Sequence, residues 1–181
     1  ASKNYRQNDK DTSWAVRGLE KYIPEDLYLT EAITREAIQT LDHRNSNKPF
    51  FLYLSHYAVH VPYEKDIRFY QKYIGAGLTD TEAKYAALVE GMDKSLGDII
   101  NYLEKNGLDK DTYILFTSDN GGLSLKGSRS GEPHTQNLPL KQGKGSLYEG
   151  GIRVPAIAAG PQIKPGSVSK QYIISEDYFT T

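Results

Sequence analysis

The chain has 181 residues, of which 38% are hydrophobic and 25% are charged, with a formal net charge of −1 and no cysteine. This length suffices for one domain with a buried core, and the composition is that of a folded protein rather than a disordered one. The near-neutral charge, without a cluster of Lys or Arg, argues against a nucleic-acid surface. No apolar run approaches the ~20 residues that cross a bilayer. The lack of cysteine excludes disulfides, thiolate metal sites and a cysteine nucleophile in this chain.

The first part of the chain predicts a loop, a helix and a strand. Residues 1–26 are polar and poorly periodic, so we expect a loop or excursion. Thr30 is placed to cap a helix over residues 31–41. Its apolar face would carry Ile33, Ala37, Ile38 and Leu41. The continuous apolar and aromatic run Phe50–Ser55 is typical of a strand that is covered on both faces.

A longer helix is predicted from Thr79 onward. Thr79-Asp80-Thr81-Glu82 is a capping-box sequence, and Gly107 is placed to end the helix about 25 residues later. Its apolar positions repeat at spacings of four and three, as in an amphipathic helix. They are Tyr85, Val89, Met92, Leu96, Ile99 and Leu103.

Strand, helix and strand in this order predict an α/β fold. A second strand is expected at Tyr113–Thr117, and a right-handed βαβ unit would make it parallel to Phe50–Ser55. A third strand is expected at Val154–Ala159, and another element begins within Tyr172–Thr181. We therefore predict a mainly parallel sheet flanked by helices.

The stretch Asp119-Asn120-Gly121-Gly122 follows the second strand and admits two interpretations. Asn-Gly is a strong turn signal, so the residues can form an ordinary turn. Their carboxylate and amide oxygens also suit Ca²⁺ or Mg²⁺, although two ligands fall short of the roughly six that these ions take. Ligands of parallel sheets collect at the carboxyl ends of strands, so Asp119 and Asn120 should lie on the same edge as His56 and His60.

Two further residue types carry possible chemistry. His60 stands beside Pro62, and a lone histidine is either structural or catalytic. A zinc pair of His56 and His60 is disfavoured, because the segment follows a strand instead of lying on a helix. Lys144 lies between two glycines, where it can hold an anion, but the segment lacks the full phosphate-loop pattern, so a solvated lysine is the alternative.

Five segments in order resemble the type I sulfatase family of the alkaline-phosphatase-like superfamily. They are YLTEAITREAI, PFFLYLSHYAVHVP, VEGMDKSLGDIINYLEKNG, ILFTSDNGG and NLPLKQGKGSLYEGGIRVPAIAAGP. The resemblance covers residues 27–181, and the last segment is the most diagnostic. It implies that residues 1–181 form one incomplete sulfatase catalytic domain.

The resemblance implies roles for four residues and a reaction. Asp119 and Asn120 would be two of the oxygen ligands of Ca²⁺, Lys144 would contact the sulfate, and His60 would assist the leaving oxygen. The implied reaction is hydrolysis of a sulfate ester with hydrated formylglycine as the nucleophile. Calcium would neutralise charge on the sulfate oxygens, Lys144 would stabilise charge, and His60 would act as general acid.

The chain also departs from the family pattern. The Asp-Asp pair and the C-x-P/A-S-R segment that yields formylglycine are missing, and the loose match Ser13-Trp14-Ala15-Val16-Arg17 is taken as coincidence. We therefore expect a fragment whose calcium ligands and nucleophile are completed by the remaining sulfatase chain, and which is inactive alone.

Alternatives to a sulfatase remain open. One is a phosphomonoester or phosphonate hydrolase of the same superfamily, and another is a non-catalytic module that binds sulfated carbohydrate. A sulfated glycan is the expected substrate, with no nucleic-acid partner and no membrane span. Export to a periplasm, cell surface or lysosome-like compartment is implied by the resemblance.

Overall fold

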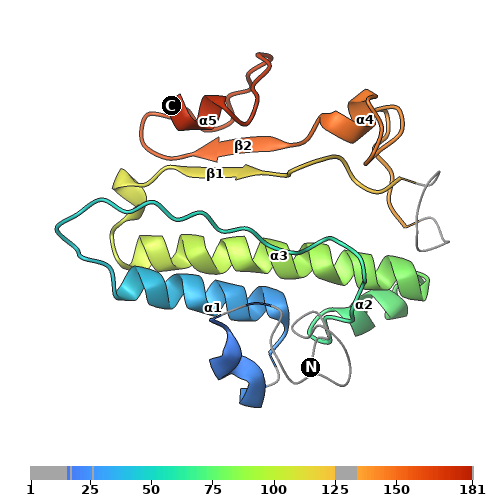
Figure 1. Ribbon diagram of the computed structural model, residues 1–181, viewed down its shortest axis with the longest axis horizontal. Coiled ribbons are helices and arrows are strands. Elements are labelled where there is room, and N and C mark those ends of the chain that lie inside the picture. The colour runs from blue at the N-terminus through green and yellow to red at the C-terminus, as the bar shows by residue number, and fades with distance from the viewer. Residues whose placement is uncertain (1–15, 17, 26, 125–133, 181) are drawn as a thin grey trace.

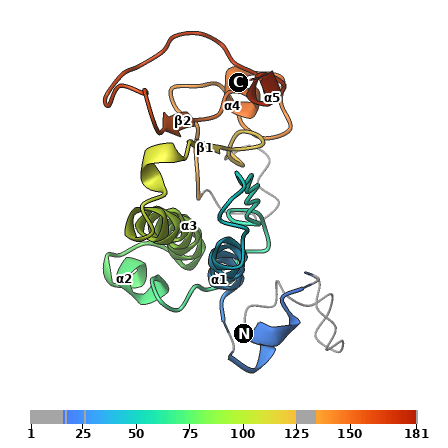
Figure 2. The same ribbon diagram turned by 90° about the vertical axis from the view of Figure 1, so that its left-hand side faces the viewer.

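A computed structural model describes residues 16, 18–25, 27–124 and 134–180. In chain order the elements are η2 (Glu20–Glu25), α1 (Leu29–Asp42), α2 (Tyr70–Gly75), α3 (Asp80–Lys105), η3 (Asp109–Asp111), β1 (Ile114–Thr117), α4 (Glu149–Ile152), β2 (Ala156–Ala159) and α5 (Asp177–Thr180). The helices α1 and α3 lie side by side as one layer, and β1 and β2 lie above them as a second (Figures 1 and 2). The described part of the chain is therefore an α/β arrangement.

The long helix α3 begins and ends as its sequence predicts. Thr79 accepts a hydrogen bond from the Glu82 amide, and the Glu82 carboxylate accepts one from the Thr79 amide, so the capping box forms. Gly107, with a φ of 66°, follows the helix end in the left-handed conformation that glycine adopts readily.

The buried face of α3 differs from the predicted one. Its buried positions include Ala83, Ala87, Gly91, Ser95, Ile99 and Leu103, each four residues after the last. Val89, expected on this face, is 40% exposed. The small residues of this stripe permit close approach: a Cβ on Gly91 would lie 2.8 Å from the carboxylate of the buried Asp66. Ile99 and Leu103 are therefore confirmed on the buried face, whereas small residues that the prediction did not include line the rest of this stripe.

Thr30 does not cap α1, which begins one residue before it. Tyr28 is the N-cap residue and makes no side-chain capping bond. Leu29 is buried with Leu19 and Tyr22 in a small cluster, and this packing draws the helix start toward the N-terminus. Thr30 lies inside the helix, where its carbonyl accepts a 2.6 Å hydrogen bond from the Thr34 hydroxyl.

The sheet within the described residues is antiparallel and two-stranded. Ile114 pairs with Ala159 and Thr117 with Ala156, so the third predicted strand is confirmed over Ala156–Ala159. The predicted βαβ pairing is not formed there, since Phe50–Ser55 is paired with no strand among the described residues. That segment still alternates: Phe50, Leu52 and Leu54 pack on the core cluster of Ala37, Ile99 and Leu103, whereas Phe51 is 91% exposed. It has the side-chain period of a strand but no ladder partner among the described residues.

The segment before β2 contains the single-turn helix α4, and the element expected within Tyr172–Thr181 is the helix α5. No helix among the described residues is both long enough and apolar enough to span a membrane.

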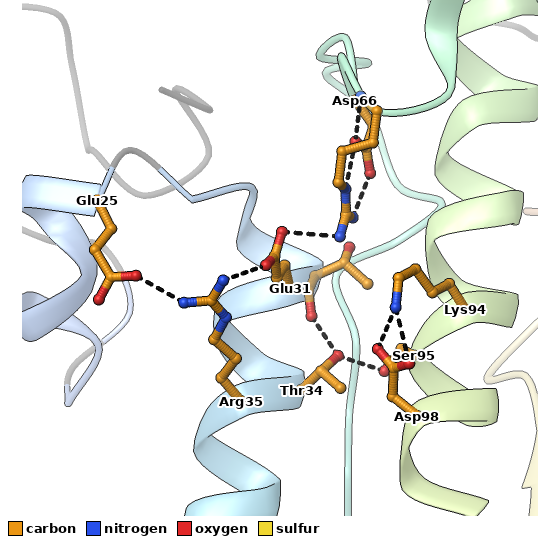
Figure 3. A network of polar contacts seen from close by, with 10 residues as sticks. Glu25, Glu31, Thr34, Arg35, Asp66, Lys94, Ser95 and Asp98 are labelled. Atoms are coloured by element: carbon orange, nitrogen blue, oxygen red, sulfur yellow. Dashed lines mark hydrogen bonds and ion pairs between the residues drawn. The ribbon is translucent and has the colours of Figure 1, made fainter. Parts of the chain in front are cut away.

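A polar network fixes the segment downstream of His60 on the helical layer (Figure 3). Asp66 is fully buried and accepts two hydrogen bonds from the Arg68 guanidinium, at 2.9 and 2.6 Å. Arg68 also contacts Glu31 of α1 at 2.9 Å, and Glu31 contacts Arg35 at 2.6 Å. The buried carboxylate is thus paired and hydrogen-bonded, as burial of a charge requires.

Candidate active site

Five glycines join the end of β1 to the loop that carries Lys144. This glycine cluster comprises Gly121, Gly122, Gly143, Gly150 and Gly151. The Gly121 amide donates to the Gly151 carbonyl at 3.0 Å, and the Lys144 amide donates to the Gly122 carbonyl at 3.0 Å. These two backbone bonds bring the Asp119–Gly122 segment and the Lys144 loop together.

The cluster needs glycine because backbones touch there. A Cβ on Gly121 would lie 1.8 Å from the Gly150 carbonyl oxygen, and one on Gly150 would lie 2.0 Å from that of Gln142. A Cβ on Gly143 would lie 2.3 Å from the Gly122 carbonyl oxygen. No real Cβ tolerates such distances, so each glycine permits a close backbone approach.

This packing bears on the interpretation of Asp119-Asn120-Gly121-Gly122 as an ordinary turn. Gly121 and Gly122 have no φ in the left-handed region, which a tight Asn-Gly hairpin turn requires. Hairpin-turn chemistry therefore does not explain the two glycines. They follow β1 because the Lys144 loop packs against them.

Asn137 is a second link between these segments. Its side-chain oxygen accepts from the Gly122 amide at 3.0 Å, and its side-chain nitrogen donates to the Gly122 carbonyl at 2.9 Å and to the Gln142 carbonyl at 3.1 Å. One amide side chain thereby satisfies three backbone groups. Sequence reasoning missed Asn137, whose partners are 15 and five positions away along the chain.

The predicted cation ligands lie at the end of β1. Asp119 is exposed and Asn120 is half-buried. The described residues contain no group of three or more His, Asp or Glu side chains that could hold a metal ion. Asp119 and Asn120 offer the oxygen donors that Ca²⁺ prefers, so their chemistry fits two of the roughly six ligands that this ion takes.

Lys144 and His60 are both exposed. The Nδ1 atom of His60 lies 2.7 Å from the Val61 carbonyl oxygen. A carbonyl only accepts, so Nδ1 carries a proton and Nε2 is the nitrogen that can exchange a proton with a ligand. No hydrogen bond or ion pair among the described residues joins His60 directly to Asp119, Asn120 or Lys144.

His56 takes part in a different, partly buried contact. Its Nε2 lies 3.0 Å from the Ser95 hydroxyl, which lies 2.5 Å from the Thr34 hydroxyl. Burial lowers the pKa of His56. The ring thus ties its segment to α1 and α3, which favours the structural interpretation of His56 over a zinc ligand. The Ser13–Arg17 pattern falls largely outside the described residues.

The described residues thus form an α/β arrangement in which oxygen donors follow β1 and the loop that carries Lys144 packs against the same end of this strand. The family model described as Sulfatase matches residues 2–181, and the chain belongs to this family.

Individual relatives and solved structures agree. The chain is 37% identical to N-acetylgalactosamine-6-sulfatase of Rattus norvegicus, over 86% of this chain and 27% of the relative. It is 33% identical to a sulfatase of Formosa agariphila, over 93% of this chain and 30% of the relative. The crystal structure of Ps i-CgsB in complex with k-i-k-neocarrahexaose is similar with a TM-score of 0.66 and 36% identity, over 75% of this chain and 28% of that one. The chain thus spans less than a third of each of these proteins.

Proposed function

We propose that this chain is part of a sulfuric ester hydrolase that removes sulfate from a sulfated glycan. The observation that carries the proposal is the glycine cluster, which holds the Asp119–Asn120 strand end against the Lys144 loop. An oxyanion ligand at this edge would meet a cationic side chain beside two oxygen donors suited to a divalent cation. Family membership supports the sulfate ester as the substrate class. The names of two similar proteins, which specify a sulfated sugar or a carbohydrate ligand, support the glycan.

In this proposal each predicted residue has one task. Lys144 binds the sulfate oxygens and stabilises the charge that grows on them during reaction. His60, protonated at Nε2, gives a proton to the leaving oxygen, which is worth typically ~10²–10⁴-fold in rate. Asp119 and Asn120 would hold Ca²⁺ together with ligands from the rest of the protein. Bound calcium supplies neutralisation of sulfate charge, and a formylglycine outside this chain supplies the nucleophile.

A larger, mainly parallel sheet in the full-length protein is also part of the proposal. We infer that in the full-length protein Phe50–Ser55 is a strand of a larger, mainly parallel sheet. Its alternating side chains and the exposed Phe51 support this, since an uncovered strand face of this kind normally packs against further structure. We also propose that residues 1–181 lie within one catalytic domain and that the protein is exported, because sulfated glycans are met outside the cytoplasm.

The test compares sulfate and phosphate esters on the full-length protein. We expect release of sulfate from 4-nitrophenyl sulfate and from a sulfated oligosaccharide, and a loss of about 10²–10³-fold in kcat for Lys144→Ala. Lys164→Ala, an exposed lysine after β2, is the matched control and should leave kcat unchanged. Release of phosphate without sulfate would identify a phosphoester hydrolase instead. Binding of the oligosaccharide without calcium or turnover would identify a binding module.

A further inference from the structure

The aromatic side chains of Tyr63, Tyr85 and His134 form a cluster that contains none of the proposed site residues. The Tyr63 hydroxyl lies 2.5 Å from Nε2 of His134. The ring centroids of Tyr63 and His134 are 4.8 Å apart, and those of Tyr85 and His134 are 5.3 Å apart. Tyr63 and Tyr85 meet edge to face at 5.8 Å. All three are half-buried, and none belongs to the hydrophobic core clusters of the described residues.

This cluster joins the two halves of the proposed site through short covalent links. Tyr63 is three residues after His60, with Pro62 stiffening the connection. His134 is three residues before Asn137, which binds the backbone of Gly122 and Gln142. A path of contacts therefore leads from the His60 segment to the strand end and to the Lys144 loop. Tyr85, on α3, packs against both rings and anchors the contact to the helical layer.

The hydrogen bond between Tyr63 and His134 holds in either charge state of the imidazole. Burial, with Tyr85 nearby, raises the pKa of Tyr63 to about 12, so the phenol keeps its proton at neutral pH. When His134 is neutral with a bare Nε2, the phenol donates to it. When His134 is protonated, Nε2–H donates to the phenol oxygen. The contact is thus suited to holding position rather than to transferring a proton.

We propose that Tyr63 and His134 are positioning residues that hold the His60 segment in register with the Lys144 loop. The inference rests on the proposed function, in which His60 and Lys144 act on one ester. A general acid must lie within hydrogen-bond reach of the leaving oxygen, and small displacements of such a group reduce the rate strongly. His60 lies on an exposed segment of this chain. The position of its imidazole therefore depends on contacts such as the hydrogen bond between Tyr63 and His134.

The experiment is a double-mutant cycle in the full-length protein. Tyr63→Phe and His134→Ala are measured alone and together, with 4-nitrophenyl sulfate and with phenyl sulfate, whose leaving oxygen is more basic and needs protonation more. We expect each single variant to lose about 10- to 100-fold in kcat on phenyl sulfate with KM little changed. The loss on 4-nitrophenyl sulfate should be smaller, and the double variant should be no worse than the more impaired single variant. His134→Gln, whose amide oxygen accepts from the Tyr63 hydroxyl, should recover part of the loss.

Tyr102→Phe is the matched control, since it removes a hydroxyl that donates to Asp42 at 2.7 Å near the far end of α3. It should leave kcat for both esters unchanged. Equal losses on both esters, additive losses in the double variant, or losses no larger than in the control would overturn the proposal.

A readout without turnover separates this proposal from the proposed function. Backbone amides of residues 57–65 should exchange hydrogen faster in Tyr63→Phe and His134→Ala than in the parent protein or in Tyr102→Phe. If the parent cleaves phosphate esters only, the proposed function fails, and the cycle is repeated with 4-nitrophenyl and phenyl phosphate. Unchanged exchange at residues 57–65 rejects the positioning role whichever ester is cleaved.

Discussion

At the scale of single residues, the glycines of the candidate site permit close backbone contacts rather than a tight turn. The glycines near Asp119–Asn120 and Lys144 lie where the backbone of another segment occupies the space that a Cβ atom would need. Gly97, in the middle of α3, is the contrasting case, because nothing lies within 4 Å of a Cβ built on it. The same residue type therefore has opposite consequences for substitution at the two places.

This contrast gives a prediction for Gly150→Ala. The new Cβ would meet the Gln142 carbonyl oxygen at 2.0 Å and must displace the Lys144 loop. We expect a loss of about 1–3 kcal/mol in the free energy of unfolding, as for other overpacked sites, together with a large loss of activity. Gly97→Ala should instead stabilise by about 0.5–1 kcal/mol, since alanine favours a helix interior. Denaturant titration of both variants in the full-length protein checks the signs, and a neutral Gly150→Ala would contradict the packing argument.

His56 gives a prediction for pH. Burial lowers its pKa in the folded protein, so below the unfolded value of about 6.5 the unfolded chain binds a proton that the folded chain resists. Stability from His56 is therefore present at pH 7.5 and is lost as the pH falls toward 5.5. His56→Gln, which can still bond Ser95 but does not titrate, should show a smaller fall in the free energy of unfolding over this range. Identical pH slopes for both proteins would contradict the assignment.

At the scale of elements, the segment beyond His60 contains a buried ion pair between Asp66 and Arg68, and Arg68 also contacts Glu31 of α1. Asp66 is 0% exposed, and the side chain of its partner Arg68 is 25% exposed. The Lys94–Asp98 pair on α3 has a similar length, 2.7 Å, but both of its side chains are more than a third exposed (Figure 3). Charge removal should therefore cost far more at the first pair than at the second.

We predict that Arg68→Ala destabilises the protein by on the order of 3 kcal/mol, because it leaves a buried carboxylate without its partner. Lys94→Ala should change the free energy of unfolding by no more than about 0.5 kcal/mol. Thermal and denaturant unfolding of the two variants measures the difference. Adding Asp66→Asn to Arg68→Ala should restore part of the loss, since the uncompensated charge is then gone; a further loss would show that the carboxylate is not the cause.

The helices also show what sequence patterns can predict. The capping box at Thr79 and the closing glycine at Gly107 fix the ends of α3 through contacts within a few residues, and both were predicted. The start of α1 was wrong by two residues because Leu29 is drawn into a cluster with η2. The buried face of α3 was partly wrong because small residues let α1 and Asp66 approach. Both errors come from tertiary packing, which a local pattern does not contain.

At the scale of the whole molecule, the candidate site is built from distant segments. The sequence predicted that Asp119 and Asn120 follow a strand, and it places Lys144 between two glycines. It did not predict that Gly121 meets Gly151, that Asn137 bridges Gly122 and Gln142, or that β1 and β2 run antiparallel. These contacts depend on backbone approach between segments far apart along the chain, and single residues carry little signal for them.

Calcium removal tests the site at this scale. If Asp119 and Asn120 hold Ca²⁺ in the full-length protein, chelation should lower its free energy of unfolding. The loss should be about 2.7 kcal/mol when the free calcium concentration before chelation is 100 times Kd. Asp119→Asn should reduce this dependence, whereas Asp93→Asn, on the exposed side of α3, should not. Thermal unfolding with and without chelator gives the comparison. A chelator effect that is equal in both variants would place the calcium elsewhere.

The antiparallel pairing of β1 with β2 bears on the order in which the protein folds. The helical layer is formed largely by contacts within and between α1 and α3, and both helices precede β1 in the chain. The pairing Ile114↔Ala159 and the meeting of Gly121 with Gly151 each close a long loop, which costs chain entropy before any contact is gained. During synthesis the helices emerge first, so we expect the Asp119–Gly122 segment and the Lys144 loop to meet late, after the helices have formed.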